Sequence, residues 1–468
     1  MPSKSRASAG ADRRRAGGAA STAIAPARRC AYAVLRRVFE RGAYADLALQ
    51  AESERLDRRD RALAMRLSYG AVQRKGTLDY LIERLAERPA ERLDAPVLAA
   101  LRLGLYELVY LSGSPDRAVV ADTVELAKRH ARGGHGLVNA VLRRAAREGA
   151  AALLDGLDEA TAEQAALMHS HPAWIAKLWW ERLGPADTRA LLACDNEPGE
   201  LAVRANTLLT DADALMLALA ESSVATRRDA TIPEAVVLDG PLDNHETPLW
   251  QQGAFIAQSR AAMLVARTLA PSPGERVLDL CAAPGGKTTH LAALMEGRGQ
   301  IVAVERNRAR AGALERTARR LHVANVHVEL GDAARPREQP AAFDRVLVDP
   351  PCSGLGTLQA RADLRWRVSE DAVAQMAVTQ RAILAAGAEA LRPGGVLVYS
   401  TCTISPIENE HVIESFLDSH DDFRLDDLAS ELPGYADGAP RISLPGTVLT
   451  LPHRDGTAGF FIARLRRS

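Results

Sequence analysis

Residues 277–288 read Val-Leu-Asp-Leu-Cys-Ala-Ala-Pro-Gly-Gly-Lys-Thr, a short apolar run that ends in a glycine-rich turn. Further apolar runs rich in β-branched residues follow it, with helical stretches at 286–295, 307–321 and 370–391 between them. Strands that alternate with helices predict an α/β fold, a doubly wound parallel sheet with helices on both faces. Ligands of such sheets bind beyond the carboxyl ends of the strands. The expected strands are Val277–Leu280, Gln300–Val304, Val326–Glu329, Arg345–Val348 and Val396–Ser400.

The remainder of the chain divides into three regions ahead of this pattern, which occupies 251–468. Residues 1–25 are rich in Arg, Ala and Gly and are expected to form a basic disordered arm. From 26 to 150, apolar residues recur at three- and four-residue steps, which predicts an all-α bundle of about six helices. Residues 151–250 are expected to form a small connecting α+β subdomain, a β-α-β unit with strands at Leu201–Arg204 and Ala235–Leu238.

Charge is balanced over the whole chain but divided along its length. The 59 basic and 59 acidic side chains give a formal net charge of zero. Residues 1–150 carry 28 Lys and Arg against 17 Asp and Glu, whereas residues 151–468 carry 31 against 42. Such asymmetry points to a polyanionic partner, although charge alone fits an uneven arginine-rich composition equally well.

Several classes of protein do not fit this composition. No run of 18 apolar residues indicates a membrane span, and the first 25 residues lack the apolar segment of a secretory signal. The five cysteines are widely spaced and odd in number, which argues against a disulfide framework or a metal site. We therefore expect a cytoplasmic protein in a reducing setting, without a bound metal.

The ends of the first three strands carry side chains suited to an adenosine ligand. The loop from Cys281 to Lys287 opens a helix, where glycines admit a close ligand and free N–H groups suit a carboxylate. Glu305 follows the second strand, where an acid accepts hydrogen bonds from a ribose diol. Asp332 follows the third strand, where a carboxylate receives an adenine amino group. Each feature alone fits an ordinary turn or loop as well, but in series they predict an adenosine site.

The fourth and fifth strands end in Asp349-Pro350-Pro351-Cys352 and Ser400-Thr401-Cys402. Because these strands are neighbours in such a fold, we expect both thiols at one crevice. Three interpretations are open: two small buried hydrophobes, a redox disulfide, or covalent catalysis on a pyrimidine. In the third, a thiolate adds to C6 of cytosine and activates C5, while a protonated or hydrogen-bonding carboxyl such as Asp349 stabilises the electron density at N3. A second acid–base group then helps to release the product.

These motifs together resemble the RNA (cytosine-5) methyltransferase superfamily. The helical region resembles NusB, an RNA-binding fold, through Leu101–Leu108 and Val138–Arg143. A NusB-like helical region followed by these methyltransferase motifs is similar to the Sun/RsmB family, which methylates a cytosine of small-subunit ribosomal RNA using S-adenosylmethionine. The resemblance covers about residues 27–468. It implies a Rossmann-like methyltransferase domain behind a NusB-like domain, working as a monomer on ribosomal RNA.

The resemblance also implies a role for each motif residue. Cys402 matches the nucleophile, and Cys352 matches the cysteine that assists proton removal and enzyme release. Asp349 faces both base and cofactor, and Lys287 supplies charge at the crevice. The implied contacts of S-adenosylmethionine are Cys281, Ala282, Ala283, Pro284, Gly285, Gly286, Lys287, Glu305, Asp332 and Asp349.

Two positions depart from the family pattern, and two other functions stay open. Glu305 and Ala458 stand where Asp is usual or common, which puts cofactor affinity and substrate fit in question. The alternatives are the same chemistry on transfer RNA, or a non-catalytic RNA-binding factor in ribosome assembly. For RNA contact, we expect Arg361, Arg365 and Arg367 around Trp366 to matter more than the arginines between 306 and 320.

Overall fold

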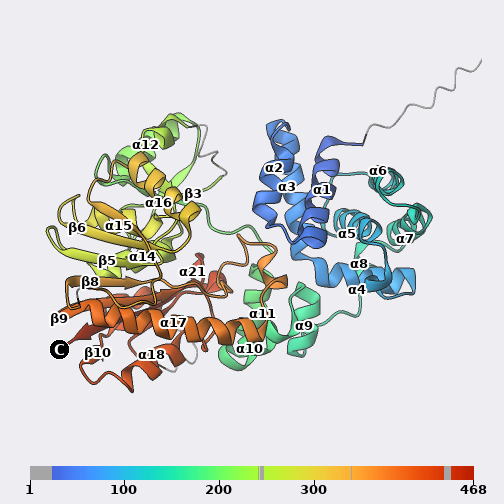
Figure 1. Cartoon of the computed structure of the whole chain (residues 1–468). Helices are drawn as coiled ribbons and strands as arrows, with labels where there is room; N and C mark the ends of the chain where they lie inside the picture. Colours follow the sequence, from blue (N-terminus) through green and yellow to red (C-terminus); the bar gives the residue numbers. More distant parts are fainter. Residues whose placement is uncertain (1–23, 241, 243–246, 339, 437–443) are drawn as a thin grey trace, which may run out of the picture.

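The computed structural model describes residues 24–240, 242, 247–338, 340–436 and 444–468. Helices from the first third of the chain, blue and cyan in Figure 1, lie beside an α/β region built around a large sheet. The basic arm expected for residues 1–25 lies outside the described residues except for its last two.

The helical domain extends to Leu154 and has more helices than the sequence pattern predicted. About six were expected, and the structure has seven between residues 26 and 148 and a short eighth. The additional helix is α2, whose buried residues include Ala45, Ala48 and Ser53, and such small side chains give a weak periodic signal. The helices are α1 (Pro26–Arg41), α2 (Ala45–Ser53), α3 (Arg58–Gln73), α4 (Lys75–Ala86), the 3-10 turn η1 (Ala90–Arg92), α5 (Ala95–Tyr110), α6 (Asp116–His130), α7 (His135–Glu148) and α8 (Ala150–Leu154).

A four-stranded antiparallel sheet connects this domain to the rest, in the order β2-β3-β1-β4. The sequence analysis expected only β1 and β3, and it ended this region at residue 250. β4 lies beyond that boundary and pairs with β1, so the small sheet extends further along the chain. The elements are α9 (Ala162–His169), α10 (Ala173–Leu183), α11 (Pro185–Cys194), β1 (Ala202–Ala205), α12 (Ala212–Glu221), β2 (Thr226–Arg228), β3 (Ala235–Leu238), α13 (Pro248–Gln251) and β4 (Phe255–Ala257).

The large sheet has eight strands, in the order β10-β12-β9-β8-β5-β6-β7 with β11 paired to β12. The five expected strands are present as β5 to β9 and pair in parallel. Its strands are β5 (Arg276–Leu280), β6 (Gln300–Glu305), β7 (Val326–Leu330), β8 (Phe343–Val348), β9 (Leu391–Thr401), β10 (Phe423–Leu425), β11 (Val448–Leu449) and β12 (Phe461–Arg467). The helices around it are α14 (Arg260–Leu269), α15 (Gly286–Leu294), α16 (Arg308–Arg320), the 3-10 turn η3 (Leu364–Trp366), α17 (Glu370–Ala390), α18 (Glu410–Leu417), α19 (Leu428–Glu431), α20 (Pro433–Ala436) and α21 (Pro452–Asp455).

The expectation of a wholly parallel sheet is wrong at one end. β12 pairs antiparallel with β9, β10 and β11, so the sheet is mixed. After β9, the next strand to pair with it is β12, which runs in the opposite direction. Only pairing in space shows the direction of such a strand, because an apolar run reads the same for either direction.

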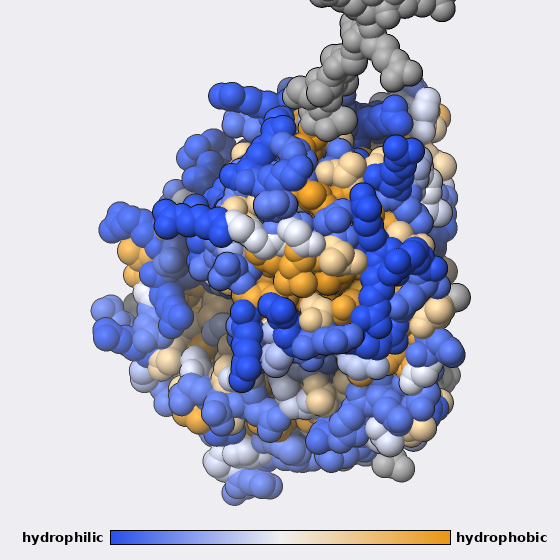
Figure 2. All heavy atoms as spheres, turned by 90° about the vertical axis from the view of Figure 1, so that its right-hand side faces the viewer, coloured by the Kyte–Doolittle hydropathy of each residue, from blue (hydrophilic) through white to orange (hydrophobic). Residues whose placement is uncertain are grey.

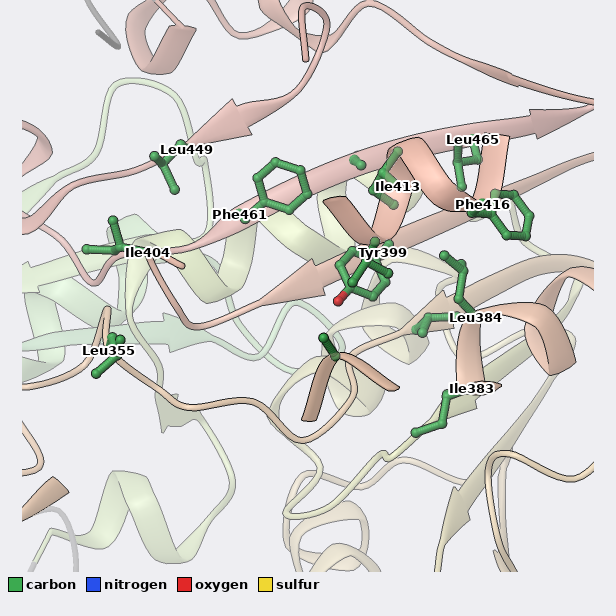
Figure 3. Close-up of a cluster of buried hydrophobic side chains, with 14 of the residues drawn as sticks. Leu355, Ile383, Leu384, Tyr399, Ile404, Ile413, Phe416, Leu449, Phe461 and Leu465 are labelled. Carbon is green, nitrogen blue, oxygen red and sulfur yellow. The ribbon is translucent and has the colours of Figure 1, made fainter. Parts of the chain in front are cut away.

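Helices cover both faces of the large sheet, and one face also receives the helices α9 to α11. Trp179 of α10 is fully buried in the same core as Leu280 of β5 and Tyr399 of β9. Figure 3 shows the rings of Tyr399 and Phe461 at the centre of this core, between Leu355 and Ile404 on one side and Phe416 on the other. The helices α9 to α11 therefore share a core with the sheet, although their sequence was assigned to the connecting region.

Phe461→Ala is expected to destabilise the protein by about 3–5 kcal/mol, because it leaves a cavity in this core. Phe461 is fully buried and its ring packs edge-on against Tyr399, with centroids 6.4 Å apart. Urea unfolding followed by circular dichroism measures the loss. Val378→Ala on the exposed side of α17 is the control, with an expected change below about 0.5 kcal/mol. Equal midpoints for the two variants would contradict this assignment of the core.

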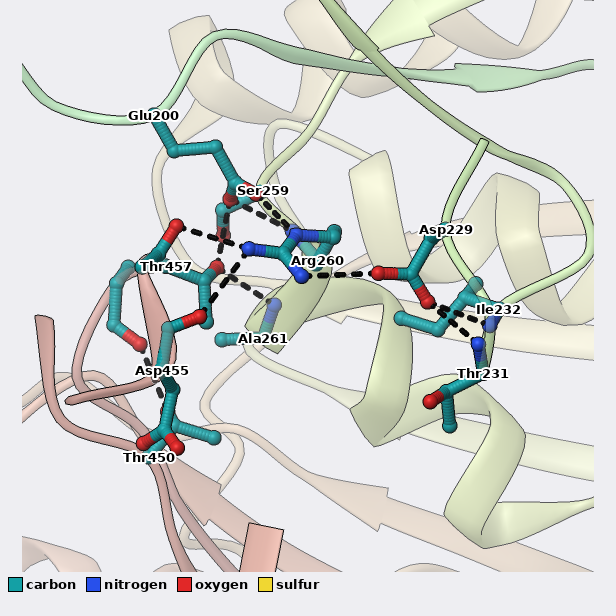
Figure 4. Close-up of polar contacts among 12 residues, drawn as sticks. Glu200, Asp229, Thr231, Ile232, Ser259, Arg260, Ala261, Thr450, Asp455 and Thr457 are labelled. Carbon is teal, nitrogen blue, oxygen red and sulfur yellow. Dashed lines mark hydrogen bonds and ion pairs between the residues drawn. The ribbon is translucent and has the colours of Figure 1, made fainter. Parts of the chain in front are cut away.

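A half-buried arginine links the small sheet to the segment that precedes β12. Arg260, at the start of α14, pairs with Glu200 and with Asp229, the latter at 2.9 Å, and donates to the Gly456 carbonyl at 2.9 Å. Figure 4 shows these partners converging on its guanidinium group from three segments. Since Glu200 precedes β1 and Gly456 precedes β12, this ion-pair network holds the segment around Ala458 in place.

Candidate active site

Five strand ends meet at one edge of the large sheet. The neighbouring strands β9, β8, β5, β6 and β7 are parallel, so their carboxyl ends lie side by side. The structure brings together Cys402 after β9, Asp349 and Cys352 after β8, and Lys287 at the start of α15, as a pair of thiols in contact with each other and an ion pair near them. Glu305 and Asp332 follow the adjacent strands β6 and β7.

The two thiols, expected from the sequence at one crevice, are in direct contact. Cys352 Sγ lies 3.3 Å from Cys402 Sγ. A hydrogen bond from the Cys352 thiol lowers the pKa of Cys402 against the effect of burial, and the charges of Arg361 and Lys287 act in the same direction. The same hydrogen bond, together with burial and the nearby charge of Glu408, raises the pKa of Cys352 well above its usual value. Cys402 is therefore the thiol that ionises first, and thiolate is the nucleophilic form.

An ion pair lies beside the thiols. Lys287 Nζ is 2.7 Å from Asp349 Oδ2, and the Ser400 hydroxyl donates to Asp349 Oδ1 at 3.0 Å. Burial alone would lower the pKa of Lys287, but the charge of Asp349 outweighs it and raises the pKa. The ammonium also lies 5.0 Å from the ring centroid of Phe460, so its position is fixed from two sides.

The loop between β5 and α15 is tightly folded and leaves polar groups available. Gly285 has a φ of 102°, and a Cβ there would come within 2.5 Å of Leu314 Cδ1, so only glycine fits. No side chain caps the N-terminus of α15. The amide of Gln258 lies beside Gly286, and among the described residues neither its nitrogen nor its oxygen has a hydrogen-bond partner although both are buried. Orphaned polar groups beside a helix N-terminus suit a charged or polar ligand group.

The two acids expected to bind a ribose and an adenine differ in their surroundings. Glu305 is almost fully buried and its carboxylate accepts the Asn307 N–H at 2.8 Å, with Arg310 Nε at 3.7 Å. Asp332 is exposed and accepts the Ala334 N–H at 3.0 Å. Each carboxylate keeps capacity for further hydrogen bonds, because every oxygen can accept two. Their ligand contacts remain predictions.

Two buried carboxylates behind the site were not among the predicted residues. Asp279 of β5 accepts from the Thr288 hydroxyl at 2.7 Å, and burial, with the charge of Asp349, raises its pKa to about 7. Glu408 accepts the Ser353 N–H at 2.8 Å and the Gln380 amide at 3.0 Å, and burial raises its pKa. Glu408 thereby fixes the backbone next to Cys352. The sequence signal for Asp279 was a charged residue within an apolar strand, whereas Glu408 lies among polar residues and gave no such signal.

The segment around Ala458 borders the site, which the sequence did not reveal. The Gly459 N–H donates to the Gly356 carbonyl at 2.7 Å, close behind Cys352 in the chain. A Cβ on Gly356 would come within 2.0 Å of the Gly459 carbonyl oxygen, so the two backbones are in direct contact. Phe460, the next residue, is the one that lies beside Lys287.

The predicted RNA contacts at 361–367 are wrong for Arg365. Arg365 is fully buried and donates to the carbonyls of Asp195 at 2.9 Å and Ser170 at 3.2 Å. Its guanidinium is used inside the protein and cannot reach a phosphate. Arg367 donates to the Gly42 carbonyl at 3.0 Å, and Trp366 Nε1 donates to the Val72 carbonyl at 2.7 Å. The sequence analysis assigned these side chains to RNA contact because it had no information on packing against the helical domain.

The described ranges contain no group of three or more His, Cys, Asp or Glu side chains arranged to hold a metal ion. Within the same ranges, no helix is long and apolar enough to cross a membrane.

Alkylation by iodoacetamide is expected to modify Cys402 at lower pH than Cys352. The lowered pKa of Cys402 raises its thiolate fraction near neutral pH, whereas the raised pKa keeps Cys352 protonated there. Peptide mass spectrometry after short reactions between pH 6 and pH 9 measures both, with those limits chosen to span about 8.5, the usual cysteine pKa. Cys281, whose pKa burial raises to about 12, is the internal control and stays unmodified. Modification of Cys352 first would contradict the assignment.

Comparison with known proteins supports three domains. The NusB family model matches residues 25–147, the ferredoxin-like domain of RsmF/B-like methyltransferases matches 171–245, and the 16S rRNA methyltransferase RsmB/F model matches 266–466. The probable ribosomal RNA small subunit methyltransferase B of Synechocystis is 37% identical over 94% of this chain and 99% of its own. The Bacillus subtilis protein with the same description is 34% identical over 91% and 95%. The crystal structure of PH0851 superposes with a TM-score of 0.81 and 26% identity, over 95% of this chain and 99% of that one.

Proposed function

The chain belongs to the RsmB/F family of small-subunit ribosomal RNA methyltransferases, and we propose that it methylates C5 of a cytosine in that RNA through a covalent bond between Cys402 and C6. The observation that carries this proposal is the contact between two thiols, 3.3 Å apart, at the ends of adjacent strands. The thiol with the lowered pKa faces the Lys287–Asp349 ion pair.

Covalent addition solves a chemical problem of this substrate. C5 of cytosine is a weak nucleophile until an electron pair enters the ring. The Cys402 thiolate supplies that pair by forming an S–C6 bond, which gives C5 enamine character. C5 then takes the methyl group, so that it carries both a methyl group and its original proton. The target base has to leave its stack for C6 to reach the thiolate.

Cys352 is suited to complete the reaction. The C5 proton has to be removed so that the C6–S bond breaks and its electron pair returns to Cys402. The pKa of Cys352 is raised first of all by its hydrogen bond to Cys402. Once Cys402 is bonded to C6, that thiolate no longer exists, so Cys352 loses its proton more readily and becomes the base beside the adduct.

Asp349 and Lys287 are suited to the polar edge of the base. In its pair with Lys287, Asp349 is a carboxylate, and it accepts a hydrogen bond from the exocyclic amino group of cytosine. A protonated Asp349, one form considered from the sequence, would disrupt this pair. The positive charge on Lys287 offsets the electron density that the ring gains when the thiolate adds.

The residues at the loop fit S-adenosylmethionine, which supplies an electrophilic methyl group. The uncapped start of α15 and the orphaned Gln258 amide fit its amino-acid end. The loop from Cys281 to Lys287 would contact the cofactor, and Glu305 and Asp332 would bind its ribose and its adenine. Glu305 is one carbon longer than the usual Asp, but it is buried at the end of β6 and its carboxylate has capacity to accept from a diol.

The helical domain supports an RNA partner. Seen from its side of the molecule, in Figure 2, the surface is mostly hydrophilic, with a group of hydrophobic side chains near the centre. Arg55, Arg58, Arg59 and Arg66 are exposed around α3. Exposed arginines attract a polyanion and make its binding sensitive to salt. We propose that the protein acts as a monomer in the cytoplasm.

Methylation of purified RNA tests the function directly. The full-length protein is incubated with S-adenosylmethionine and small-subunit ribosomal RNA from cells that lack its gene, followed by bisulfite sequencing. One new 5-methylcytosine is expected there, and none in large-subunit RNA as the control. If 5-methylcytosine formed only in added transfer RNA, transfer RNA would be the substrate instead of ribosomal RNA. An absence of both methylation and cofactor binding by calorimetry would favour a non-catalytic assembly factor.

A further inference from the structure

The segment that follows Cys352, residues 353–367, is attached to both the sheet domain and the helical domain. We propose that the helical domain holds this segment against Cys402, and that Arg361 is the positive side chain which the segment presents to the thiol. The helical domain then supports the chemistry as well as contacting RNA. The inference rests on the proposed function and adds a positioning role for Trp366 and Arg367.

The first half of the segment is fixed to the sheet domain. Leu355 and Leu358 are fully buried in the core beneath the sheet. The Gly356 N–H donates to the Cys402 carbonyl at 3.0 Å, so the segment touches the backbone of the nucleophile itself. Any movement of the segment therefore moves Cys402 or breaks this bond.

The second half is fixed to the helical domain through Trp366. Its indole N–H donates to the Val72 carbonyl at the end of α3, at 2.7 Å, and Lys75 Nζ lies 5.0 Å from the ring centroid. A Cβ on Gly76 would come within 3.0 Å of the ring, so α4 and the ring are in close contact. Ala362 is buried in the core of the helical domain.

Arg367 and Asp363 make a second attachment, at the start of α2. Arg367 donates to the Gly42 and Ala43 carbonyls, lies over the Tyr44 ring at 4.5 Å, and pairs with Asp363. Asp363 in turn accepts the Ala45 N–H at 3.3 Å. The bonds to the backbone of Gly42, Ala43 and Ala45 join residues more than 300 positions apart in the chain. Because they are directed at backbone groups, they specify one position of the segment.

Arg361 lies between the half of the segment that is fixed to the sheet domain and the half that is fixed to the helical domain. It is exposed, and its N–H donates to the Thr357 carbonyl at 3.0 Å in a helical turn. Its Nη1 is 3.5 Å from the point that a Cβ on Gly354 would occupy, two residues after Cys352. No ion pair of Arg361 occurs within the described part of the chain, so its charge is not offset by a carboxylate there.

The charged and titratable groups that face Cys402 come from three elements. Cys352 and Asp349 lie after β8, Lys287 lies on α15, and Arg361 lies on the segment. Lys287 is paired with Asp349, so those two charges largely offset each other. Arg361 is then the unpaired cation of the set, and its charge favours the thiolate.

Alkylation of Cys402 in the full-length protein tests this arrangement without RNA or methyl transfer. Arg361→Ala is expected to move the pH dependence of iodoacetamide alkylation upward and to slow it about tenfold at pH 7 for each pH unit of that shift. Arg361→Lys restores most of the rate, because it restores the charge. Arg424→Ala, an exposed arginine on β10 at the far edge of the sheet, is the matched control and leaves the profile unchanged.

The attachment is tested with Arg367→Ala and, as a milder change, Trp366→Phe, which keeps an aromatic ring but removes the indole N–H together with the five-membered ring that carries it. Both are expected to reproduce the upward shift in part and to lower kcat for methylation, with KM for RNA and calorimetric cofactor affinity unchanged. An unchanged alkylation profile in all three variants would overturn the proposal. A raised KM alone would also overturn it, since the helical domain would then act only by binding RNA. Failure of the proposed function would appear separately, as methylation that persists in Cys402→Ala.

Discussion

Cys402→Ala is expected to bind S-adenosylmethionine normally and to lose methyl transfer by about 10⁴-fold or more, because C5 is not activated without the S–C6 bond. The effect is large because no other described side chain occupies the same place. Cys352 is 3.3 Å away but has a raised pKa, and it lies after a different strand. Transfer of a labelled methyl group to ribosomal RNA measures the rate, and calorimetry measures cofactor binding.

Cys30→Ala provides the control for this experiment. Cys30 is buried in the helical domain and also has a raised pKa, to about 11, so it is a thiol with no part in the site. Its replacement is expected to leave turnover unchanged. Normal turnover by Cys402→Ala at saturating cofactor would refute covalent catalysis by this residue.

Cys352→Ala is expected to accumulate a covalent protein–RNA complex. The Cys402 thiolate still adds to C6 and the methyl group is still transferred, but the base that removes the C5 proton is gone. Turnover falls by roughly 10²–10⁴-fold, the usual contribution of a positioned acid–base group. A band of retarded mobility on a denaturing gel, formed only with RNA, measures the complex.

The double variant Cys352→Ala/Cys402→Ala separates this explanation from misfolding. It is expected to give no retarded band, since the bond to C6 cannot form, while its circular dichroism spectrum matches that of Cys352→Ala. A retarded band in the double variant would show that another nucleophile reacts. Free release of methylated RNA by Cys352→Ala would assign proton removal to a different group, of which Glu408 is the nearest buried carboxylate to that backbone.

Much of the fold was predictable because the relevant signals are local. β5 to β8 begin and end within two residues of the predicted positions, since each is a short apolar run bounded by a turn, whereas β9 begins at Leu391, five residues before the predicted Val396. α2, β2 and β4 were missed, because short elements with small or exposed residues have little periodicity. The antiparallel return of β12 was also missed, since strand direction depends on which strand it pairs with.

The sequence by itself determined which residues stand at the strand ends. Chain position predicted that Cys352, Cys402, Asp349 and Lys287 lie at one edge, because the carboxyl ends of parallel neighbours share it, and the family resemblance supplied their expected roles. The three-dimensional fold decided how these groups affect one another. The thiol contact that separates the two cysteine pKa values and the Lys287–Asp349 pair both depend on distances of a few ångströms.

Only the tertiary structure decided which of the arginines near Trp366 are buried, which bind other parts of the protein and which are exposed. The sequence shows a basic run beside an aromatic residue, which equally describes an RNA contact and an interface within the protein. Packing buries Arg365 completely, commits Arg367 to backbone carbonyls of the helical domain, and leaves Arg361 exposed beside the site. The physical reason is that burial of a charge depends on partners more than 100 residues distant, and no local pattern carries that information.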